Sequence, residues 1–379
     1  MFDALFVPAD ARDALGDSAW LAALVEVEAA LARAEVAAGV IPEEAGEAIG
    51  AACRPGAFDP SALVEEGRAP GNPVEPLVRA LREAVGDAGA AEYVHFGATS
   101  QDILDTAAML VSGLVLGLIL ERLEAVAEEC AQLADAHRVT PMIGRTLLQQ
   151  AEAVTFGLKA AGWLVAVLDA RTTLARVRDE RLAVQLGGAS GTAAPLGDSG
   201  PEVLRLLARE LELAEPVTPW HTNRTRIAEL GAALAITSGV AGKIGLDIGL
   251  MSQSEVGEVS EANPGASSAM PHKRNPVGSV LAVACARQVH AQAGVLTAAL
   301  VQEHERAFGG WHAEWPALVG ALGYTTGAVD GARRALDGLE VHEERMQANL
   351  EQSGRQPDLG SAEVFVDRAL ASYREVART

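Results

Sequence analysis

Five long segments of this chain carry proline only within their first two residues or not at all, and they are rich in residues that favour helices. They cover residues 101–137, 147–184, 222–254, 276–303 and 315–339. Each is roughly 25 to 37 residues long, whereas the average helix of a globular protein has about 11 to 12. Because alanine and leucine lose little conformational freedom on entering a helix, this texture predicts an all-α fold built on five long helices.

The apolar residues of these segments do not form a single narrow stripe. In residues 154–182 they occur on more than one face of the expected helix, and a helix that is apolar all round must be buried. Hydrophobic residues make up 49% of the chain but aromatic residues only 4%, so alanine, leucine and valine must build the core. We therefore predict a central bundle of long helices whose outer faces are covered by neighbouring subunits. No GxGxxG or P-loop motif occurs, which argues against a nucleotide-binding sheet.

The distribution of proline divides the chain into three parts. Five prolines between Pro42 and Pro73 break residues 1–98 into shorter helices, which predicts an N-terminal helical domain. Residues 99–340 contain the long segments and should form the central bundle domain. Residues 341–379 are expected to form an abbreviated C-terminal segment.

The net charge limits the classes of partner that the protein can bind, and the cysteines indicate its cellular compartment. The net charge is 30 − 51 = −21, and such a surface repels nucleic acid and anionic lipid, so we expect neither as a partner. The most apolar run, Ala107–Leu120, is shorter than the about 20 residues that span a bilayer. The three cysteines form no CxxC pair, and the N-terminus lacks the basic start of a signal peptide. We therefore expect a cytoplasmic protein.

Residues 265–276, Gly-Ala-Ser-Ser-Ala-Met-Pro-His-Lys-Arg-Asn-Pro, place reactive side chains between a glycine and a proline. These flanking residues argue against one continuous helix. On a loop, Ser267 or Ser268 could transfer a proton while Lys273 and Asn275 stabilise a developing negative charge. The alternative is a solvated loop between helices, because loops are generally exposed and polar.

This segment resembles the signature loop of the fumarase/aspartase superfamily, Gly-Ser-Ser-x-Met-x-x-Lys-x-Asn. Here Ala266 separates the glycine from the serine pair, and counting back from Met270 gives Ser267 as the reactive serine. The resemblance implies a homotetramer with a shared helical core and composite active sites. It also implies catalytic roles for Ser267, Lys273 and Asn275, and substrate contacts for Ser268 and Met270.

A second polar segment, His95-Phe-Gly-Ala-Thr-Ser-Gln-Asp102, precedes the first long helix. Thr99 or Ser100 could simply cap that helix. Alternatively, their hydroxyls and the free N–H groups of the helix start could hold a carboxylate. The segment resembles the first shared region of the superfamily, which implies that Thr99 and Ser100 bind substrate and that His95 is catalytic. Without the resemblance, His95 would be interpreted as a structural histidine.

A third segment, Gly144-Arg-Thr-Leu-Leu-Gln149, resembles the second shared region. Thr146 and Gln149 match that region and are implied to bind substrate, but Leu147 stands where amine-eliminating members carry histidine. An amine needs a proton to leave, whereas a carboxylate leaves unaided because the pKa of its conjugate acid is about 4. Leu147 therefore favours making or breaking a bond between carbon and a carboxylate oxygen. The alternative is that another histidine supplies the proton: His95, His221 or His312.

Two further segments carry arginine, histidine and tryptophan. In Trp220-His-Thr-Asn-Arg-Thr-Arg226, either arginine could pair with a neighbouring acid, or one could bind a carboxylate bidentately; we take Arg226 as the candidate. The tryptophans and histidines of residues 302–315 could simply pack in the core. No HExxH or facial-triad spacing occurs there, so we expect no metal site.

Taken with these segments, the resemblance over residues 2–350 is strongest to the carboxymuconate cycloisomerases of the superfamily. It implies a cofactor-independent enzyme that binds a small di- or tricarboxylate. One carboxylate of 3-carboxy-cis,cis-muconate would add across the conjugated double bond to give 4-carboxymuconolactone, the reverse of a β-elimination. Two alternatives stay open: an adenylosuccinate-like or related C–N lyase of the same superfamily, and a catalytically silent helical scaffold.

Overall fold

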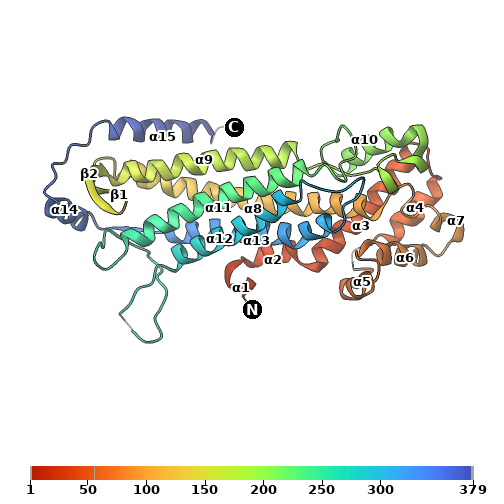
Figure 1. Cartoon of the computed structure of the whole chain (residues 1–379), viewed down its shortest axis with the longest axis horizontal. Coiled ribbons are helices and arrows are strands. Elements are labelled where there is room, and N and C mark those ends of the chain that lie inside the picture. The colour runs from red at the N-terminus through yellow and green to blue at the C-terminus, as the bar shows by residue number, and fades with distance from the viewer. Residues whose placement is uncertain (1, 55, 271, 377–379) are drawn as a thin grey trace.

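Five long helices form an elongated bundle in the computed structural model (Figure 1), which describes residues 2–54, 56–270 and 272–376. The predicted all-α fold is confirmed, with short strands only at one end of the bundle. The bundle helices are α8 (Ser100–Ala136), α9 (Phe156–Glu180), α11 (Thr225–Met251), α12 (Val277–Ala298) and α13 (Gly310–Leu336).

One of the predicted helices begins later than the sequence suggested. Residues 147–155, expected to be helical, instead complete an antiparallel hairpin of β1 (Pro141–Thr146) and β2 (Gln149–Thr155). Leu147 and Leu148 form its two-residue loop with φ angles of 53° and 64°, the left-handed conformation that matches the twist of the paired strands. Strand pairing thus overrides the local helix preference, and α9 starts only after Thr155, whose hydroxyl accepts a hydrogen bond from the backbone N–H of Leu158 at 2.9 Å.

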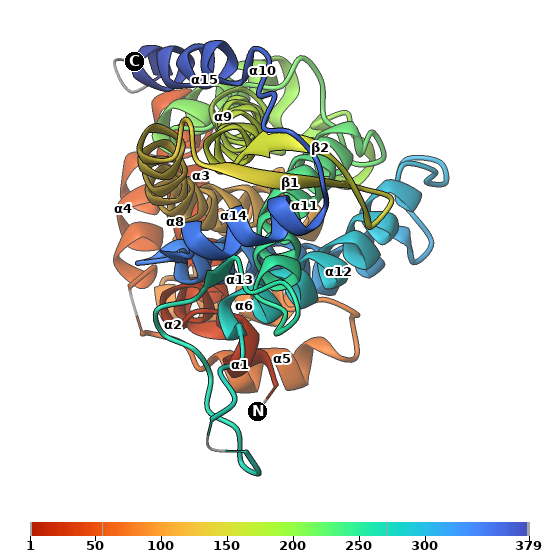
Figure 2. The same cartoon turned by 90° about the vertical axis from the view of Figure 1, so that its left-hand side faces the viewer.

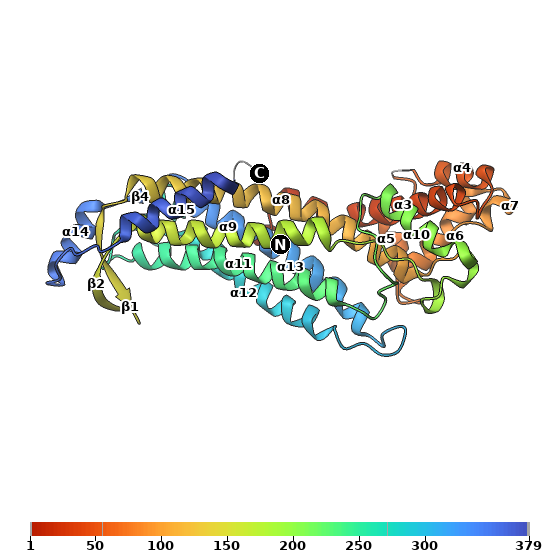
Figure 3. The same ribbon diagram turned by 90° about the horizontal axis from the view of Figure 1, so that it is seen from above.

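Shorter helices gather at the end of the bundle opposite the hairpin (Figures 1 and 3). Most come from the start of the chain, but α10 joins them from its middle and packs on α3. Two more, α1 and α2, lie along the bundle itself. The bounds are α1 (Asp3–Phe6), α2 (Ala9–Leu15), α3 (Asp17–Ala37), α4 (Glu43–Ala52), α5 (Pro60–Gly67), α6 (Val74–Val85), α7 (Ala88–Ala91), η1 (Gly188–Ser190), η2 (Ala194–Ser199) and α10 (Gly200–Glu210).

Helix α8 belongs to the two large hydrophobic clusters of the described residues. Its C-terminal two thirds pack in the bundle core, where Leu116 is fully buried. Its first turns pack with the short helices, where Ile103 lies in the same cluster as Val27 of α3 and Leu77 of α6. A single continuous helix therefore fixes the position of the N-terminal helices relative to the bundle.

The C-terminal segment packs onto the bundle end that carries the hairpin. Strand β3 (Val259–Ser260) pairs with β4 (Glu340–Val341), and the chain continues through α14 (Glu343–Gln352) and α15 (Ala362–Val376). Helix α14 contacts β1 (Figure 2), and α15 lies along α9 (Figure 1). Met346, Val366 and Leu370 are buried in the bundle core.

Two bundle helices are long and apolar enough to cross a membrane by length and composition. These are α8 and α11, and 72% and 50% of their most apolar 18-residue windows are buried inside the protein. The apolar stretch of α8 is thus longer than the run considered from the sequence. Burial of this kind is what the core helix of a bundle requires.

Candidate active site

The start of α8 is tied to two distant loops by the buried carboxylate of Asp102. One of its oxygens accepts a hydrogen bond from the N–H of Thr99 at 2.9 Å, which caps the helix. The backbone N–H groups of Gly187 and Gly188 donate to the same carboxylate at 3.0 and 2.8 Å. Nε2 of His221 lies 2.6 Å from it. The capping function expected of this segment is confirmed, and it also fixes the surrounding loops.

Arg224 is buried near the start of α8, where two carboxylates bind its guanidinium group. Its guanidinium bonds to Asp105 at 2.7 and 3.0 Å and to Glu314 at 2.6 Å, and Nε1 of Trp311 donates to Asp105 at 2.9 Å. Burial alone would lower the pKa of Arg224, but the carboxylate of Asp105, followed by that of Glu314, raises it above the usual range. The prediction of acid pairing is confirmed for Arg224, whose side chain is 1% exposed and has no free face for substrate.

The neighbouring Arg226 binds a backbone carbonyl group instead of a carboxylate. Its Nη1 donates to the carbonyl oxygen of Arg181 at 2.9 Å. Burial and the positive charge of Arg181 lower the pKa of Arg226. No ion pair of Arg226 is formed among the described residues, so carboxylate binding by this residue stays a prediction.

His95 lies just before α8, four residues ahead of the N-cap Thr99. Its Nδ1 is 2.7 Å from Oε1 of Glu28, a buried residue of α3. Its backbone φ of 63° is in the left-handed region, which few residues other than glycine adopt. Burial opposes protonation, but Glu28 raises the pKa of His95 above its ordinary value.

Arg306 is a candidate substrate-binding residue that was not predicted from the sequence. It lies in the loop between α12 and α13, and its Nη1 donates to the hydroxyl of Thr99 at 3.1 Å. Its Nη2 bonds to the carbonyl oxygens of Gly188 and Ala189. All of these partners are neutral, and the described part of the chain provides no ion pair for Arg306, so its charge is available beside the N-terminus of α8. Nothing in the local sequence could reveal this, because Arg306 and Thr99 are 207 residues apart.

At the other end of the bundle, the β1–β2 hairpin presents Thr146 and Gln149. The two residues pair directly across the strands, and both are exposed. The two leucines of the turn, Leu147 and Leu148, are 96% and 76% exposed. In a single chain, Leu147 therefore lines no cavity. It could contribute to an apolar site lining only if another molecule packs against the hairpin.

The segment that carries Ser267 and Ser268 (residues 265–270 and 272–276), here called the serine loop, extends from the bundle end that carries the hairpin (Figure 2). Gly265 and Asn275 close its base by mutual backbone hydrogen bonds of 2.8 and 3.1 Å. A Cβ atom at Gly265 would lie 2.1 Å from Cγ2 of Val277, so this position requires glycine. The predicted break in the helix is confirmed, because α12 begins only at Val277.

Within this loop, the reactive groups are accessible. The hydroxyl of Ser267 accepts a hydrogen bond from the backbone N–H of Met270 at 3.1 Å. Ser268, Met270 and Lys273 are exposed, and Asn275 is half-buried. The loop therefore presents Lys273 outward, whereas Ser267 is half-buried.

The predicted site residues thus form two groups at opposite ends of one chain. His95, Thr99, Ser100 and Arg226 lie where α8 begins, whereas the hairpin and the serine loop lie near its other end (Figures 1 and 3). Helix α8 has 37 residues, and at 1.5 Å per residue it is about 55 Å long. One chain does not bring these groups to a common substrate.

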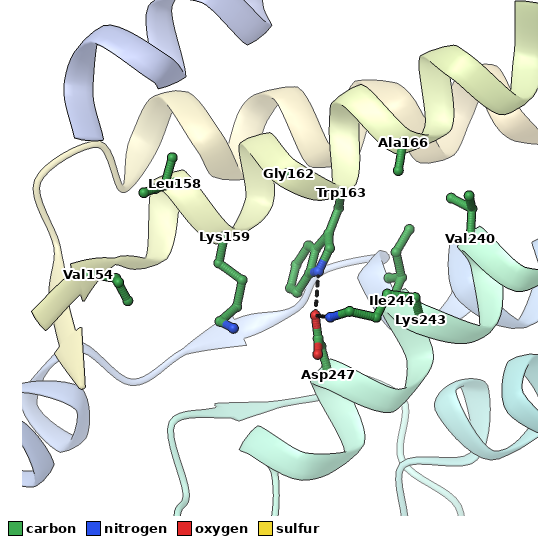
Figure 4. Close-up of a pocket in the computed structure, with 10 residues that line it drawn as sticks. All are labelled: Val154, Leu158, Lys159, Gly162, Trp163, Ala166, Val240, Lys243, Ile244 and Asp247. Atoms are coloured by element: carbon green, nitrogen blue, oxygen red, sulfur yellow. Dashed lines mark hydrogen bonds and ion pairs between the residues drawn. The ribbon is translucent and has the colours of Figure 1, made fainter. Parts of the chain in front are cut away.

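Between α9 and α11 the bundle surface carries a groove of about 430 Å³ (Figure 4). Its lining is mostly apolar, with Lys159 and Lys243 at its edge and Asp247 accepting a hydrogen bond from Nε1 of Trp163 at 2.8 Å. Burial lowers the pKa of Lys159. The groove reaches the hairpin at Val154 of β2, but none of the predicted site residues is among those that line it.

Comparison with known proteins places these features in a family. The sequence profile described as "Lyase" matches residues 10–291. The 3-carboxy-cis,cis-muconate cycloisomerase of Pseudomonas aeruginosa is 45% identical over 92% of this chain and 77% of its own length. The nitrosuccinate lyase of Streptomyces davaonensis is 46% identical over 90% of this chain and 75% of its own length. The crystal structure of the 3-carboxy-cis,cis-muconate lactonizing enzyme from Pseudomonas putida superposes with a TM-score of 0.92 at 36% identity, covering 100% of this chain and 99% of that chain.

Proposed function

Because this chain belongs to the lyase family of the fumarase/aspartase superfamily, we propose that it converts 3-carboxy-cis,cis-muconate to 4-carboxymuconolactone. The observation that carries this proposal is Leu147 at the tip of the hairpin, together with the intact serine loop. An apolar residue at that position offers no proton to a leaving group. It therefore suits a reaction in which the group that adds or leaves is already a stable anion.

In the proposed reaction, a carboxylate oxygen of the substrate attacks a carbon of the conjugated double bond and closes the lactone ring. The electron pair of that double bond moves toward a second carboxylate, which becomes a dianionic aci-carboxylate. A proton then bonds to the adjacent carbon and restores the carboxylate. The substrate's own carboxylate accepts the electrons, so the reaction needs no cofactor.

We assign the proton transfer to Ser267. Lys273, Asn275 and the loop amides would stabilise the aci-carboxylate where its charge develops. The remaining carboxylates would be positioned by the N-terminus of α8 with Thr99 and Ser100, helped by the charge of Arg306. Further substrate contacts are assigned to His95, Thr146, Gln149, Arg226, Ser268 and Met270.

We propose that the working form is a homotetramer with composite sites. The two groups of site residues lie about one α8 length apart in one chain, so an antiparallel neighbour would place its hairpin end against the start of α8. Exposed apolar side chains occur at both ends, Leu147 and Leu148 on the hairpin and Val301 and Phe308 in the α12–α13 loop. Their burial between copies would favour this arrangement. The groove between α9 and α11 would be covered in the same assembly.

We expect this enzyme in the cytoplasm. Its cysteines, Cys53, Cys130 and Cys285, are free. For Cys53, burial raises the pKa to about 12, which keeps the thiol protonated and unreactive. A small soluble carboxylate is the substrate class that fits this setting.

The decisive experiment follows the conjugated diene of 3-carboxy-cis,cis-muconate by its ultraviolet absorbance. Loss of absorbance with a proton NMR spectrum of the lactone would support the proposal. In heavy water the product should carry one deuteron on the carbon that takes up the proton. Absence of turnover at micromolar enzyme would contradict it.

A second candidate is elimination of nitrite from nitrosuccinate. The 46% identical nitrosuccinate lyase favours it, and nitrite, like a carboxylate, leaves as a stable anion without a proton. Leu147 therefore argues against an amine as the leaving group but does not separate these two reactions. Parallel assays with both substrates separate the two reactions. If the enzyme forms fumarate and nitrite from nitrosuccinate but does not turn over the muconate, the second candidate replaces the first.

A further inference from the structure

The imidazole of His95 is held by a buried carboxylate on another helix. Its Nδ1 lies 2.7 Å from Oε1 of Glu28 in α3, and the Glu28 residue is 2% exposed. No other hydrogen bond to this ring is formed within the described residues, so Nε2 is the ring nitrogen left to meet a ligand. The side chain of His95 is 13% exposed, which allows a ligand to reach it.

The backbone at His95 is also fixed in an unfavourable conformation. A φ of 63° lies in the left-handed region, which is unfavourable for a residue other than glycine. Such conformations persist only where the surroundings determine them, and they are common at functional sites. The next turn of chain enters α8 at Thr99, so the strained residue stands beside the helix N-terminus that is proposed to bind a carboxylate.

The charges that face His95 come from three helices. Glu28 lies on α3, Asp102 on α8 and Arg82 on α6. A further acid of α3, Glu35, interacts with Glu28. Glu35 is 1% exposed, and its Oε1 has no hydrogen-bond partner in the described chain. Burial, with a contribution from Glu28, raises the pKa of Glu35 to about 9, so Glu35 is neutral at pH 7. Glu28 is therefore the carboxylate that acts on His95 directly.

The hydrogen bond to Glu28 makes the charge of the ring decisive. An ionised carboxylate at Nδ1 requires a proton there. If the ring is neutral, Nε2 then carries a lone pair, which repels an incoming carboxylate. If the ring is an imidazolium ion, Nε2 carries a hydrogen and binds the carboxylate with a charge-assisted hydrogen bond. Burial opposes the charged ring, whereas Glu28 outweighs this effect and raises the pKa of His95.

We propose that Glu28 is a positioning residue that holds His95 as an imidazolium ion, with Nε2–H directed to a carboxylate of the substrate at the start of α8. This inference rests on the proposed function, because it assigns His95 to substrate binding in that reaction. It gives the N-terminal helices a role in recognising the anion, beyond supporting the fold.

The first test needs no substrate. The titration of His95 is followed by NMR of the ring nitrogens in the wild type, in Glu28→Gln and in Glu35→Gln. Glutamine at position 28 keeps an oxygen that accepts from Nδ1–H but carries no charge, so the midpoint of His95 should fall below that of the wild type. Glu35→Gln is the matched control, because it replaces a neutral acid by a neutral amide on the same helix. Its His95 midpoint should stay at the wild-type value.

The second test is the pH dependence of KM for 3-carboxy-cis,cis-muconate. Between the lowered midpoint and the wild-type midpoint, KM of Glu28→Gln should exceed the wild-type KM roughly tenfold, the size of one charge-assisted hydrogen bond, while kcat changes little. Below the lowered midpoint, the KM values of variant and wild type should converge. In a His95→Gln background, adding Glu28→Gln should change KM no further, because the two residues act through one interaction.

Each outcome decides a separate point. An unchanged His95 midpoint in Glu28→Gln would overturn the inference whatever the enzyme's substrate is. A lowered midpoint with a pH-independent change of KM would show that Glu28 only supports the fold. If wild type does not turn over the muconate, the proposed function fails, and the NMR titration still decides whether Glu28 charges His95. Should Glu28→Gln not fold, a wild-type midpoint at or below the ordinary value of about 6.5 would overturn the inference.

Discussion

Arg145 and Glu258 form a bidentate ion pair, with the two terminal guanidinium nitrogens 2.8 Å from the two carboxylate oxygens. Arg145 belongs to the β1 strand of the hairpin, and Glu258 directly precedes β3 and the serine loop. Glu258 is fully buried, and it also accepts a hydrogen bond from Asn349 of α14 at 2.9 Å. The carboxylate of Glu258 thus connects the two segments that carry Thr146 and Ser267. Asn349 of the C-terminal segment binds the same carboxylate.

We expect Arg145→Gln to destabilise the protein by about 3–5 kcal/mol, because it leaves a buried carboxylate without its cation. Denaturant unfolding followed by circular dichroism measures this change. Arg205→Gln is the control, since Arg205 pairs with Glu202 on an exposed helix face and should affect stability little. Equal effects of the two substitutions would contradict a special role of the Arg145–Glu258 pair.

Ser267→Ala should lower kcat by about 10²–10⁴-fold, the usual contribution of a general acid or base. The helical circular dichroism spectrum should not change, because Ser267 lies in a loop outside the helices. Ser268→Ala should be milder. If Ser268→Ala were the more damaging of the two, Ser268 would be the proton-transfer residue, and the extra Ala266 would account for the shifted register.

The wild type should release little or no product from adenylosuccinate or argininosuccinate, since Leu147 provides no proton for an amine. Leu147→His should not improve cycloisomerisation and should slow it, because an unpaired polar group placed in an apolar contact costs a few kcal/mol. A coupled fumarate assay measures both. Cleavage of adenylosuccinate by wild type at about 1 to 10³ per second would mean that another histidine, His95 or His312, supplies the proton.

Stability should fall as pH rises through neutrality, partly because of Glu35. Burial raises its pKa to about 9, from 4.5 in the unfolded chain, so unfolding between these values releases a proton. The stabilisation is therefore fully present below pH 4.5 and is lost progressively up to about pH 9, by at most about 1.4 kcal/mol per pH unit. In Glu35→Gln the slope of unfolding free energy against pH from 6 to 8 should be shallower than in wild type. Identical slopes would show that Glu35 is ionised in the folded protein.

Sedimentation at micromolar concentration should give a tetramer. A composite site also predicts that mixing two impaired variants, Ser267→Ala and His95→Gln, restores part of the activity after dissociation and reassociation. Each mixed assembly would contain some sites with both residues intact. A stable, active monomer would contradict the composite site.

The sequence by itself determined the long helices, the break before α12 and the residue types gathered in the serine loop. These features depend on residues close together in the chain: helix formers in long runs, Pro276 after the loop, and a serine, a lysine and an asparagine at short spacing. The identity of Leu147 likewise carried the argument about the leaving group. Local preference was wrong at residues 147–155, where pairing with β1 made a hairpin from residues that would otherwise continue a helix.

Only the tertiary structure decided which side chains meet. Glu28 and His95 are 67 residues apart, Arg145 and Glu258 are 113 apart, and Thr99 and Arg306 are 207 apart. Such contacts depend on how helices pack, and packing is driven by apolar burial that carries no information about individual polar pairs. The folded chain also separated the predicted site residues along α8, because a long helix is rigid and fixes the distance between its ends.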